Sequence, residues 1–168
     1  CRVQPGITID DLNDAIASTG LFFAPDPSTT KQANVGGCIG NNAAGTRSIK
    51  YGRTSESVQA VELILASGDT VTLGPGDPDS PRTGTERRLA EGLVDLCDRY
   101  SGLIRERFPK TKRRNAGYAL DVVLSEIDRA RNAGVNPVDA INLASIVCGA
   151  EGTLGLVSEA TLTLHPKP

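Results

Sequence analysis

The sequence contains no methionine, no tryptophan and only one histidine, and aromatic residues make up 4% of its 168 positions. No run of residues approaches the roughly 18 apolar positions that a membrane-spanning helix needs. No charged-then-apolar secretion signal opens the chain. The formal net charge of −2 gives no electrostatic attraction to nucleic acid or to an anionic membrane. These absences argue against a nucleic-acid-binding protein and against a membrane span.

The four cysteines lie far apart and form no C-x-x-C pair. Together with a single histidine, His165, this spacing fits neither a zinc site nor an iron–sulfur site. Reduced, mostly buried thiols are the expectation, with disulfides as the alternative. We therefore expect no metal site and a cytoplasmic location, which leaves room for a peripheral membrane association of a longer protein. The cysteines are Cys1, Cys38, Cys97 and Cys148.

Methionine is also absent from position 1, where the chain opens with "CRVQPG", inside an expected strand. This start predicts a processed or excised piece of a longer protein. The chemistry of the whole protein is then expected to be incomplete in this chain.

Apolar residues make up 39% of the sequence and charged residues 23%, which suffices for the packed core of one domain. A short strand is predicted at residues 2–4. A helix should follow Thr8, because Thr8 and Asp11 have the spacing of a capping box. Gly20 is expected to end this helix in the left-handed conformation.

Residues 58–66 and 70–73 are predicted to form a hairpin, with Gly68 as the first residue of a tight turn. The last strand is predicted at residues 156–165, with alternate residues facing the core. Strands and helices are mixed without strict alternation, so we expect an α+β fold with a mainly antiparallel sheet flanked by helices. The predicted core-facing residues of the last strand are Leu156, Ser158, Ala160, Leu162 and Leu164.

Two helices and a loop are predicted between these strands. Thr83 and Glu86 have capping-box spacing before one long helix, which Pro109 stops. Residues 110–124 are a basic loop that runs into an apolar segment. Asn136, with a proline after it, starts another helix that extends through Ile146. The long helix repeats apolar residues at three and four positions, so this stripe should face the core: Leu89, Leu93, Leu96, Cys97, Tyr100, Leu103 and Ile104.

Two glycine-rich segments are candidates for a binding role, with simple surface turns as the other interpretation. Residues 25–52 hold five glycines and three asparagines, and backbone freed of Cβ atoms can approach a flat or phosphorylated ligand closely. Residues 149–155 repeat glycine every three positions. Neither segment has the spacing of G-x-G-x-x-G or of a nucleotide-hydrolase loop. Surface turns remain the alternative for both, but the first segment exceeds the roughly 12–15 residues beyond which a plain loop is uncommon. We predict that residues 36–45 and 149–155 fold together into one cradle.

Five motifs stand in a fixed order along the chain: "VQPGITIDDLNDAI", "PDPSTTKQANVGGCIGNNAAGTRSIKYGRT", "VQAVELILASGDTV", "RRNAGYALD" and "CGAEGTLGLVSEATLTLHPKP". In content and order they resemble the FAD-linked oxidases, the family with the vanillyl-alcohol-oxidase or PCMH-type FAD-binding domain. The branch with the greatest likeness contains the D-lactate, glycolate and D-2-hydroxyglutarate dehydrogenases. The resemblance runs from Arg2 to Pro168 and is weakest at residues 76–108.

The resemblance implies which residues contact FAD. The Pro-Asp-Pro-Ser stretch and the Gly-Gly after it wrap the ribityl and phosphate portion in such proteins. The Asn-Asn motif lies beside the isoalloxazine ring, with the Tyr-Gly pair continuing that wall, and the Glu-Gly-Thr-Leu-Gly motif adds further contacts. The corresponding residues are Pro25, Asp26, Ser28, Gly36, Gly37, Asn41, Asn42, Ala43, Ala44, Gly45, Tyr51, Gly52, Glu151, Gly152, Gly155 and Val157.

Ala44 departs from the family, in which glycine is usual there, so a Cβ must fit and a positive φ at this position is in doubt. Arg47, Lys50 and Arg113 are candidates to stabilise the negative charge of a reduced flavin, with solvated surface charges as the alternative. Arg113 and Tyr118 are also candidates to border the substrate.

The resemblance further implies that residues 1–168 are the second lobe of the FAD-binding domain. The lobe with the pyrophosphate loop and the C-terminal cap domain are absent from this sequence. The longer protein is expected to oxidise a D-2-hydroxy acid of the lactate, glycolate or 2-hydroxyglutarate type, by hydride transfer to flavin N5. This chain itself is expected to supply no catalytic residue, and His165 is expected to be an ordinary exposed histidine. A flavin-free scaffold module and the FAD domain of an electron-transferring reductase are the alternatives, and the electron acceptor stays open.

Overall fold

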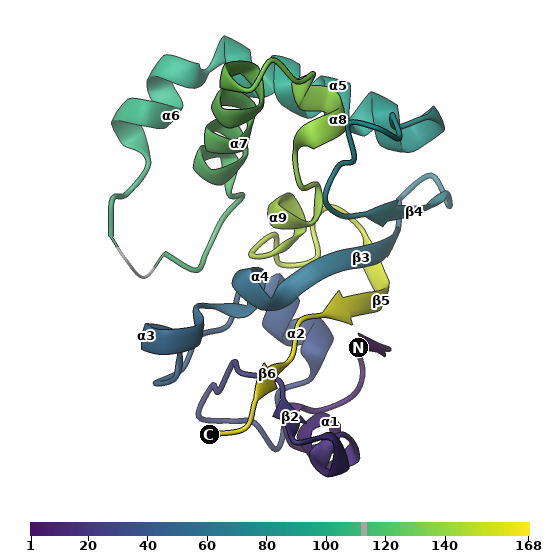
Figure 1. Cartoon of the computed structure of the whole chain (residues 1–168), viewed down its shortest axis with the longest axis vertical. Helices are drawn as coiled ribbons and strands as arrows, with labels where there is room; N and C mark the ends of the chain where they lie inside the picture. The colour runs from purple at the N-terminus through teal and green to yellow at the C-terminus, as the bar shows by residue number, and fades with distance from the viewer. Residues whose placement is uncertain (112–113) are drawn as a thin grey trace.

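An antiparallel sheet runs through the middle of the molecule (Figure 1). This computed structural model describes residues 1–111 and 114–168, and the elements named here are those of the described residues. The sheet has the order β1 (Arg2–Val3), β5 (Leu156–Leu162), β3 (Val58–Ile64) and β4 (Thr70–Leu73). A separate antiparallel pair joins β2 (Leu21–Phe22) to β6 (His165–Pro166). The predicted α+β class with an antiparallel sheet is confirmed.

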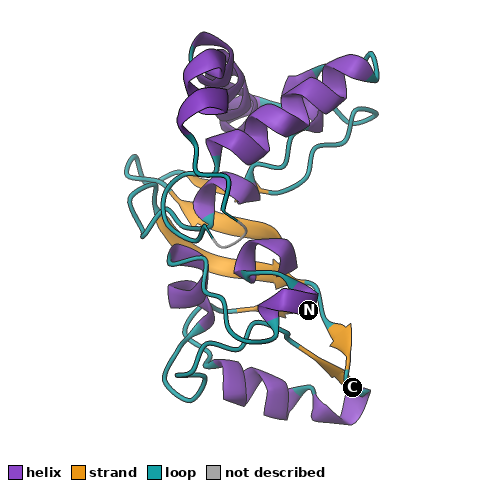
Figure 2. Ribbon diagram, turned by 90° about the vertical axis from the view of Figure 1, so that its left-hand side faces the viewer, coloured by secondary structure: helices purple, strands orange, loops and turns teal. Residues whose placement is uncertain are grey.

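The helices lie in two groups, one toward each end of the molecule. Figures 1 and 2 show α5 to α8 at one end, α1 at the other, and the sheet between them. The helices are α1 (Ile9–Ala15), the 3-10 turn η1 (Ala17–Thr19), α2 (Val35–Gly40), α3 (Ser48–Tyr51), α4 (Thr54–Ser57), α5 (Gly84–Arg99), α6 (Ser101–Arg107), α7 (Leu120–Asn132), α8 (Pro137–Ala140) and α9 (Ala144–Val147).

One core runs from the sheet into both groups of helices. The sheet provides Val61 and Leu63 of β3, and α7 adds Val123 and Ile127 from the first group. In the second group, Ile39 of α2 is fully buried. The two glycine-rich segments are therefore attached to a packed scaffold through the apolar face of α2.

Several local predictions are confirmed. The Thr8 side chain accepts the N–H of Asp11 and caps α1, as its spacing predicted. Gly20 has the predicted left-handed conformation, with φ +71°, but it ends the 3-10 turn η1, because α1 itself already ends at Ala15. Asn136 caps α8 by accepting the N–H of Val138, and Pro137 takes the first helical position.

The predicted long helix is wrong in two respects. It breaks at Tyr100 into α5 and α6, where Ser101 and Gly102 have low helix propensity. Its buried seam is also narrower than the predicted stripe. Thr83 is the N-cap residue, but its side chain makes no capping hydrogen bond. Glu86 pairs with Arg82. The buried positions are seven residues apart, at Ala90, Cys97 and Ile104, whereas Leu89, Leu96, Tyr100 and Leu103 are exposed.

The turn between β3 and β4 also differs from the prediction. The N–H of Gly68 donates to the carbonyl of Leu65, and the N–H of Leu65 donates to the carbonyl of Asp69. Gly68 has φ +88° and is the last residue of a longer turn, not the first of a two-residue turn. Its positive φ matches the left-handed position of such hairpins.

The last strand is shorter than predicted, and its first residue faces the other way. The pairing of β5 with β3 slips between Glu159 and Val157, so that Ser158 is an extra residue. A slip of one residue exchanges the two faces of a strand. Leu156, predicted to face the core, is consequently 68% exposed.

The region after residue 114 contains more helix than predicted. The apolar segment in the predicted basic loop is the beginning of α7, which buries Val123, Leu124, Ile127 and Ala130. The single helix predicted from Asn136 to Ile146 is two short turns, α8 and α9, because Ile141 has an extended backbone with ψ 151°.

Candidate functional site

The first glycine-rich segment contains a short helix, α2, with two unlike faces. Asn34 caps it by accepting the N–H of Gly37 at 2.7 Å. Val35, Cys38 and Ile39 are buried, and the glycines at 36, 37 and 40 lie on the more open face. A Cβ at Gly36 would lie 2.8 Å from the Cβ of Pro5, so glycine is needed for the chain to pass this close. The segment is thus built on an ordered element and is not irregular throughout.

The two glycine-rich segments meet, as the sequence predicted. The N–H of Gly149 donates to the carbonyl of Ile39 at 2.9 Å, and the N–H of Glu151 donates to the carbonyl of Gly40 at 3.0 Å. Gly149 and Gly152 have positive φ angles of +90° and +76°, and Glu151 has φ +53°. This left-handed backbone turns the second segment so that its N–H groups reach the end of α2.

Between these segments lies a hollow of about 320 Å³, which we call the glycine groove. Its size is at the lower end of the roughly 300–1,000 Å³ of small-molecule sites. The N–H of Gly152 has no hydrogen-bond partner among the described residues, and the space beside its Cα is open. A bare backbone donor beside an open groove fits the carbonyl or phosphate oxygens of a flavin cofactor. Five predicted residues line it: Gly36, Gly37, Gly152, Gly155 and Val157.

A second hollow, of about 600 Å³, lies around Asp26, and we call it the Asp26 hollow. The Asp26 carboxylate accepts the hydroxyl of Thr46 at 2.8 Å and the N–H of Arg47 at 2.9 Å. The Arg47 guanidinium lies 3.8 Å from the same carboxylate and 5.3 Å from the centre of the Phe22 ring. Arg47, one of the residues predicted to place a positive charge near the flavin, therefore lines this hollow, and its guanidinium is paired with the Asp26 carboxylate. The predicted residues here are Pro25, Asp26, Ser28, Ala44 and Gly45.

Two backbone positions close the Asp26 hollow. A Cβ at Gly45 would lie 1.8 Å from the carbonyl oxygen of Asp26, so only glycine fits there. Ala44, the departure from the family, has no positive φ. Its Cβ therefore creates no backbone strain, and the positive φ belongs to Asn42, at +46°.

Asn42 serves a third hollow, of about 220 Å³, which we call the Arg53 hollow. The Asn42 side chain is 4% exposed, and its oxygen accepts the N–H of Ser55 at 2.9 Å. The oxygen of its amide is thus bonded within the protein. Asn41 is exposed, and its amide donates to the carbonyl of Gly37 at 3.2 Å.

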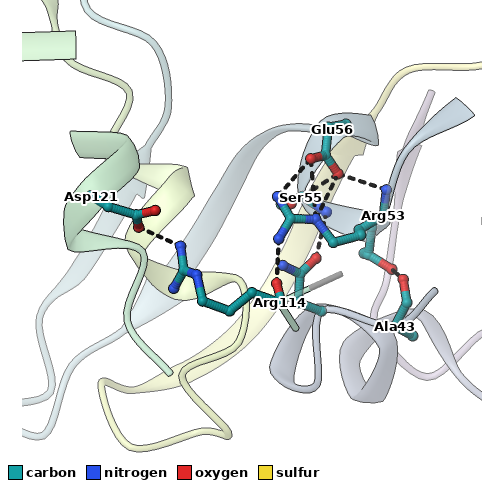
Figure 3. A network of polar contacts seen from close by, with 8 residues as sticks. Ala43, Arg53, Ser55, Glu56, Arg114 and Asp121 are labelled. Carbon is teal, nitrogen blue, oxygen red and sulfur yellow. Dashed lines mark hydrogen bonds and ion pairs between the residues drawn. The ribbon is translucent and has the colours of Figure 1, made fainter. Parts of the chain in front are cut away.

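The Arg53 hollow also contains a polar network that the sequence did not predict (Figure 3). The Arg53 guanidinium donates to the Glu56 carboxylate, with Nη2 at 2.7 Å from Oε1, and to the carbonyl of Arg114. Arg114 in turn pairs with Asp121 at the start of α7. Burial raises the pKa of Glu56, but hydrogen bonds and positive charge from Arg53 outweigh burial, so the pKa is lowered. In the sequence, the only indication of this network is that its charged residues lie next to the glycine-rich motifs.

The remaining predicted residues surround these hollows without lining them, among the residues that the structure describes. Gly52 has φ +82°, and a Cβ there would lie 2.9 Å from the Cβ of Glu56. The Tyr118 hydroxyl lies 2.7 Å from the Thr153 hydroxyl and ties its loop to the second glycine-rich segment. Arg113 lies outside the described residues. The residues in question are Asn41, Ala43, Tyr51, Gly52, Glu151 and Tyr118.

His165 is not the exposed histidine that was predicted. Its ring packs 4.9 Å from that of Tyr51 and 6.5 Å from that of Phe22, between β2 and α3. Lys50, the other predicted positive charge in the described chain, lies 4.9 Å from the centre of the Tyr51 ring. This aromatic cluster anchors α3 to the terminal strand pair, which gives Tyr51 a structural contact instead of one with a hollow.

Residues 1–111 and 114–168 include no cluster of three or more histidine, cysteine or acidic side chains suited to a metal. None of the helices described in them is both long and apolar enough to span a membrane.

Comparisons with known proteins found a family model and several relatives. Residues 1–74 match the family model described as FAD binding domain. The chain is 34% identical over 172 residues to D-2-hydroxyglutarate dehydrogenase of Pantoea ananatis (strain AJ13355), covering 99% of this chain and 16% of that protein. It is 32% identical over 166 residues to glycolate oxidase subunit GlcD of Bacillus subtilis (strain 168), covering 99% and 23%. The chain thus spans less than a quarter of the length of these relatives.

Among solved structures, alkyldihydroxyacetonephosphate synthase matches with a TM-score of 0.54 and 18% sequence identity. The match covers 99% of this chain and 19% of that one. At this identity the likeness is one of fold.

Proposed function

The chain belongs to the FAD-linked oxidase family, in the branch of the 2-hydroxy acid dehydrogenases, and on that premise we propose that it is the second lobe of an FAD-binding domain. The observation that carries the proposal is the junction of α2 with residues 149–152, which forms the glycine groove. FAD is proposed to lie along this groove, and the rest of the domain belongs to a longer protein.

The residues of the groove hold FAD through the main chain. Gly36, Gly37 and Gly152 present backbone without side-chain bulk, so a flat ring or a phosphate can come within van der Waals contact. The free N–H of Gly152 donates to a cofactor oxygen. The Asp26 hollow, with Arg47 at its edge, takes a second, more polar part of the same cofactor.

In the longer protein we propose the oxidation of a D-2-hydroxy acid. FAD held by these residues would supply the two-electron redox chemistry of this oxidation. This chain binds and orients the cofactor. No side chain here is assigned as a catalytic residue, and the proton acceptor and the substrate pocket are assigned to the other parts of the longer protein.

The test is cofactor analysis of the full-length protein that contains this chain. Released cofactor, separated by chromatography after denaturation, should be FAD. A full-length protein without flavin that also fails to take up added FAD would contradict the proposal and favour a flavin-free scaffold. The 168-residue chain alone should bind FAD roughly 10²–10⁶ times more weakly, because it lacks two or three charge-assisted hydrogen bonds to the pyrophosphate.

Two glycines provide a matched pair of variants for the groove. Gly152 and Gly134 have positive φ angles of +76° and +72°, and a Cβ at either would meet nothing within 4 Å. Gly152→Val and Gly134→Val therefore introduce similar backbone strain, but only the first places a side chain in the groove. Gly152→Val should weaken FAD binding roughly tenfold to a hundredfold relative to Gly134→Val. Equal affinities would exclude the groove as the FAD site.

A further inference from the structure

The Arg53 side chain joins two parts of the chain that are far apart in sequence. Its Nε and Nη2 atoms donate to the Glu56 carboxylate, and its Nη1 atom donates to the carbonyl of Arg114 (Figure 3). The Arg53 side chain is 20% exposed and the Glu56 side chain 45%, so the pair with Glu56 faces solvent, whereas the bond to the Arg114 carbonyl is partly buried. Glu56 is itself fixed, because its Oε2 atom accepts the backbone N–H of Arg53 at 2.6 Å.

These bonds close a ring around the Arg53 hollow. On one side, α4 holds the first glycine-rich segment: the Thr54 hydroxyl donates to the carbonyl of Ala43, and the N–H of Ser55 donates to Asn42. On the other side, the N–H of Gly117 donates to the carbonyl of Gly149 at 3.2 Å. The N–H of Gly149 in turn donates to the carbonyl of Ile39, in the first glycine-rich segment. Arg53 therefore supplies the link between α4 and residues 114–118.

Residues 114–118 pack directly against the second glycine-rich segment. A Cβ at Gly149 would lie 2.7 Å from the carbonyl oxygen of Asn115 and 3.0 Å from that of Gly117, so the two backbones are in direct contact. The Tyr118 and Thr153 hydroxyls add a second contact. Any displacement of residues 114–118 therefore reaches Gly149 and the wall of the glycine groove behind it.

We propose that Arg53 is a positioning residue, which holds residues 114–118 against Gly149 and thereby fixes the second wall of the glycine groove. The inference rests on the proposed function, since the groove is the proposed FAD site. Arginine suits the role because its planar fork bonds a carboxylate and a carbonyl at the same time. A lysine ammonium is a single point of charge and can replace only one of these two bonds at full geometry.

The experiment compares Arg53→Gln and Arg53→Lys in the full-length protein, with Arg105→Gln as the matched control. Arg105 also pairs with a carboxylate, Asp128 at 2.8 Å, but this pair lies on exposed surface between α6 and α7. The first readout is hydrogen exchange of the cofactor-free protein, at the amides of Gly117 and Gly149. The second is the FAD dissociation constant, from titration of the same protein.

In Arg53→Gln, exchange at Gly117 and Gly149 should accelerate about tenfold to a hundredfold, the effect of losing one charge-assisted hydrogen bond. FAD affinity should fall, Arg53→Lys should lie between Arg53→Gln and wild type, and Arg105→Gln should change neither readout. Unchanged exchange in Arg53→Gln would overturn the inference. Faster exchange with wild-type FAD affinity would overturn it too, because residues 114–118 would then not set the groove. A wild-type protein that binds no FAD would instead refute the proposed function, whatever the exchange shows.

Discussion

The carbonyl oxygen of Asn115 packs against the Cα of Gly149 with no side chain between the two backbones, since a Cβ at Gly149 would lie 2.7 Å from that oxygen. Gly149 also has φ +90°, which L side chains adopt at a cost of roughly 1–2 kcal/mol. Gly149→Ala should therefore destabilise the chain by more than this backbone strain alone. Chemical denaturation measures the change in the free energy of unfolding.

Gly68→Ala is the control for the Gly149 variant. Gly68 has φ +88°, but a Cβ there would meet nothing within 4 Å. Gly68→Ala should therefore show the backbone cost without the steric one. Equal losses in the free energy of unfolding for both variants would mean that the contact of residues 115–117 with Gly149 does not contribute to stability.

A second prediction concerns Arg82, which is buried although it carries a full charge. Its guanidinium donates to the carbonyls of Gly74 at 3.0 Å and Ile141 at 2.7 Å, and to Glu86 at 3.1 Å. In Arg82→Ala the carbonyls of Gly74 and Ile141 each keep one backbone donor, from Leu143 and Gly76, but the charge-assisted bonds are lost. We expect a loss of about 1.5–3 kcal/mol in the free energy of unfolding. Arg88→Ala removes an exposed arginine that bonds only the Thr85 hydroxyl among the described residues. It should stay within about 0.5 kcal/mol of wild type, and similar losses for both would contradict a structural role for Arg82.

A third prediction concerns the pH dependence of stability at Glu126. Burial raises the pKa of this carboxyl above its ordinary value of 4.5, against smaller opposing effects of the Asn142 N–H and two arginines. A raised pKa in the folded state means that stability is lost as the pH rises from 4.5 through that folded value. Glu126→Gln keeps an oxygen for the Asn142 N–H, which donates to Glu126 at 2.8 Å, and removes the buried charge.

Glu126→Gln should therefore be more stable than wild type at neutral pH, and the gain should vanish below pH 4.5. Thermal melts across this range measure the difference. Glu106→Gln, at an exposed pair with Arg107, serves as the control and should follow the wild-type curve. A gain for Glu126→Gln that persisted in acid would mean that packing, not charge, explains it.

The sequence revealed those features that depend on neighbouring residues. Thr8 and Asn136 cap helices because the side chain of each accepts a backbone N–H only two or three positions further along the chain. The spacing of Val123, Leu124, Ile127 and Ala130 also carries the helical period of α7, although the basic residues before it made the region read as a loop. The turn at Gly68 was predicted correctly, but its length was not, because a left-handed glycine occurs both in two-residue turns and in longer ones.

The arrangement of the candidate site was only partly accessible from the sequence. Glycine spacing and the family resemblance predicted that residues 36–45 and 149–155 meet, and they do. The sequence does not show that the Asn42 side chain is buried with its oxygen bonded to Ser55. Nor does it show which of the predicted residues line the three hollows, because these depend on contacts between residues distant in sequence. The link from Arg53 to Arg114 is of the same kind, since a charge pattern does not show which carbonyl it reaches.

The last prediction concerns the thiols. Cys1 is exposed, whereas Cys38, Cys97 and Cys148 are buried, and all four are free in the described chain. Burial raises the pKa of Cys38 and Cys97 to about 11 and that of Cys148 to about 12, and only the thiolate reacts with an alkylating reagent. At neutral pH, iodoacetamide should therefore modify Cys1 alone in the folded 168-residue chain, and all four thiols in denaturant, as intact-mass measurement will show. Cys1→Ser should remove the modification of the folded chain. Rapid alkylation of Cys148 in that variant would mean that the junction beside Gly149 opens readily, and the cradle would then lack the rigidity that a preformed binding site requires.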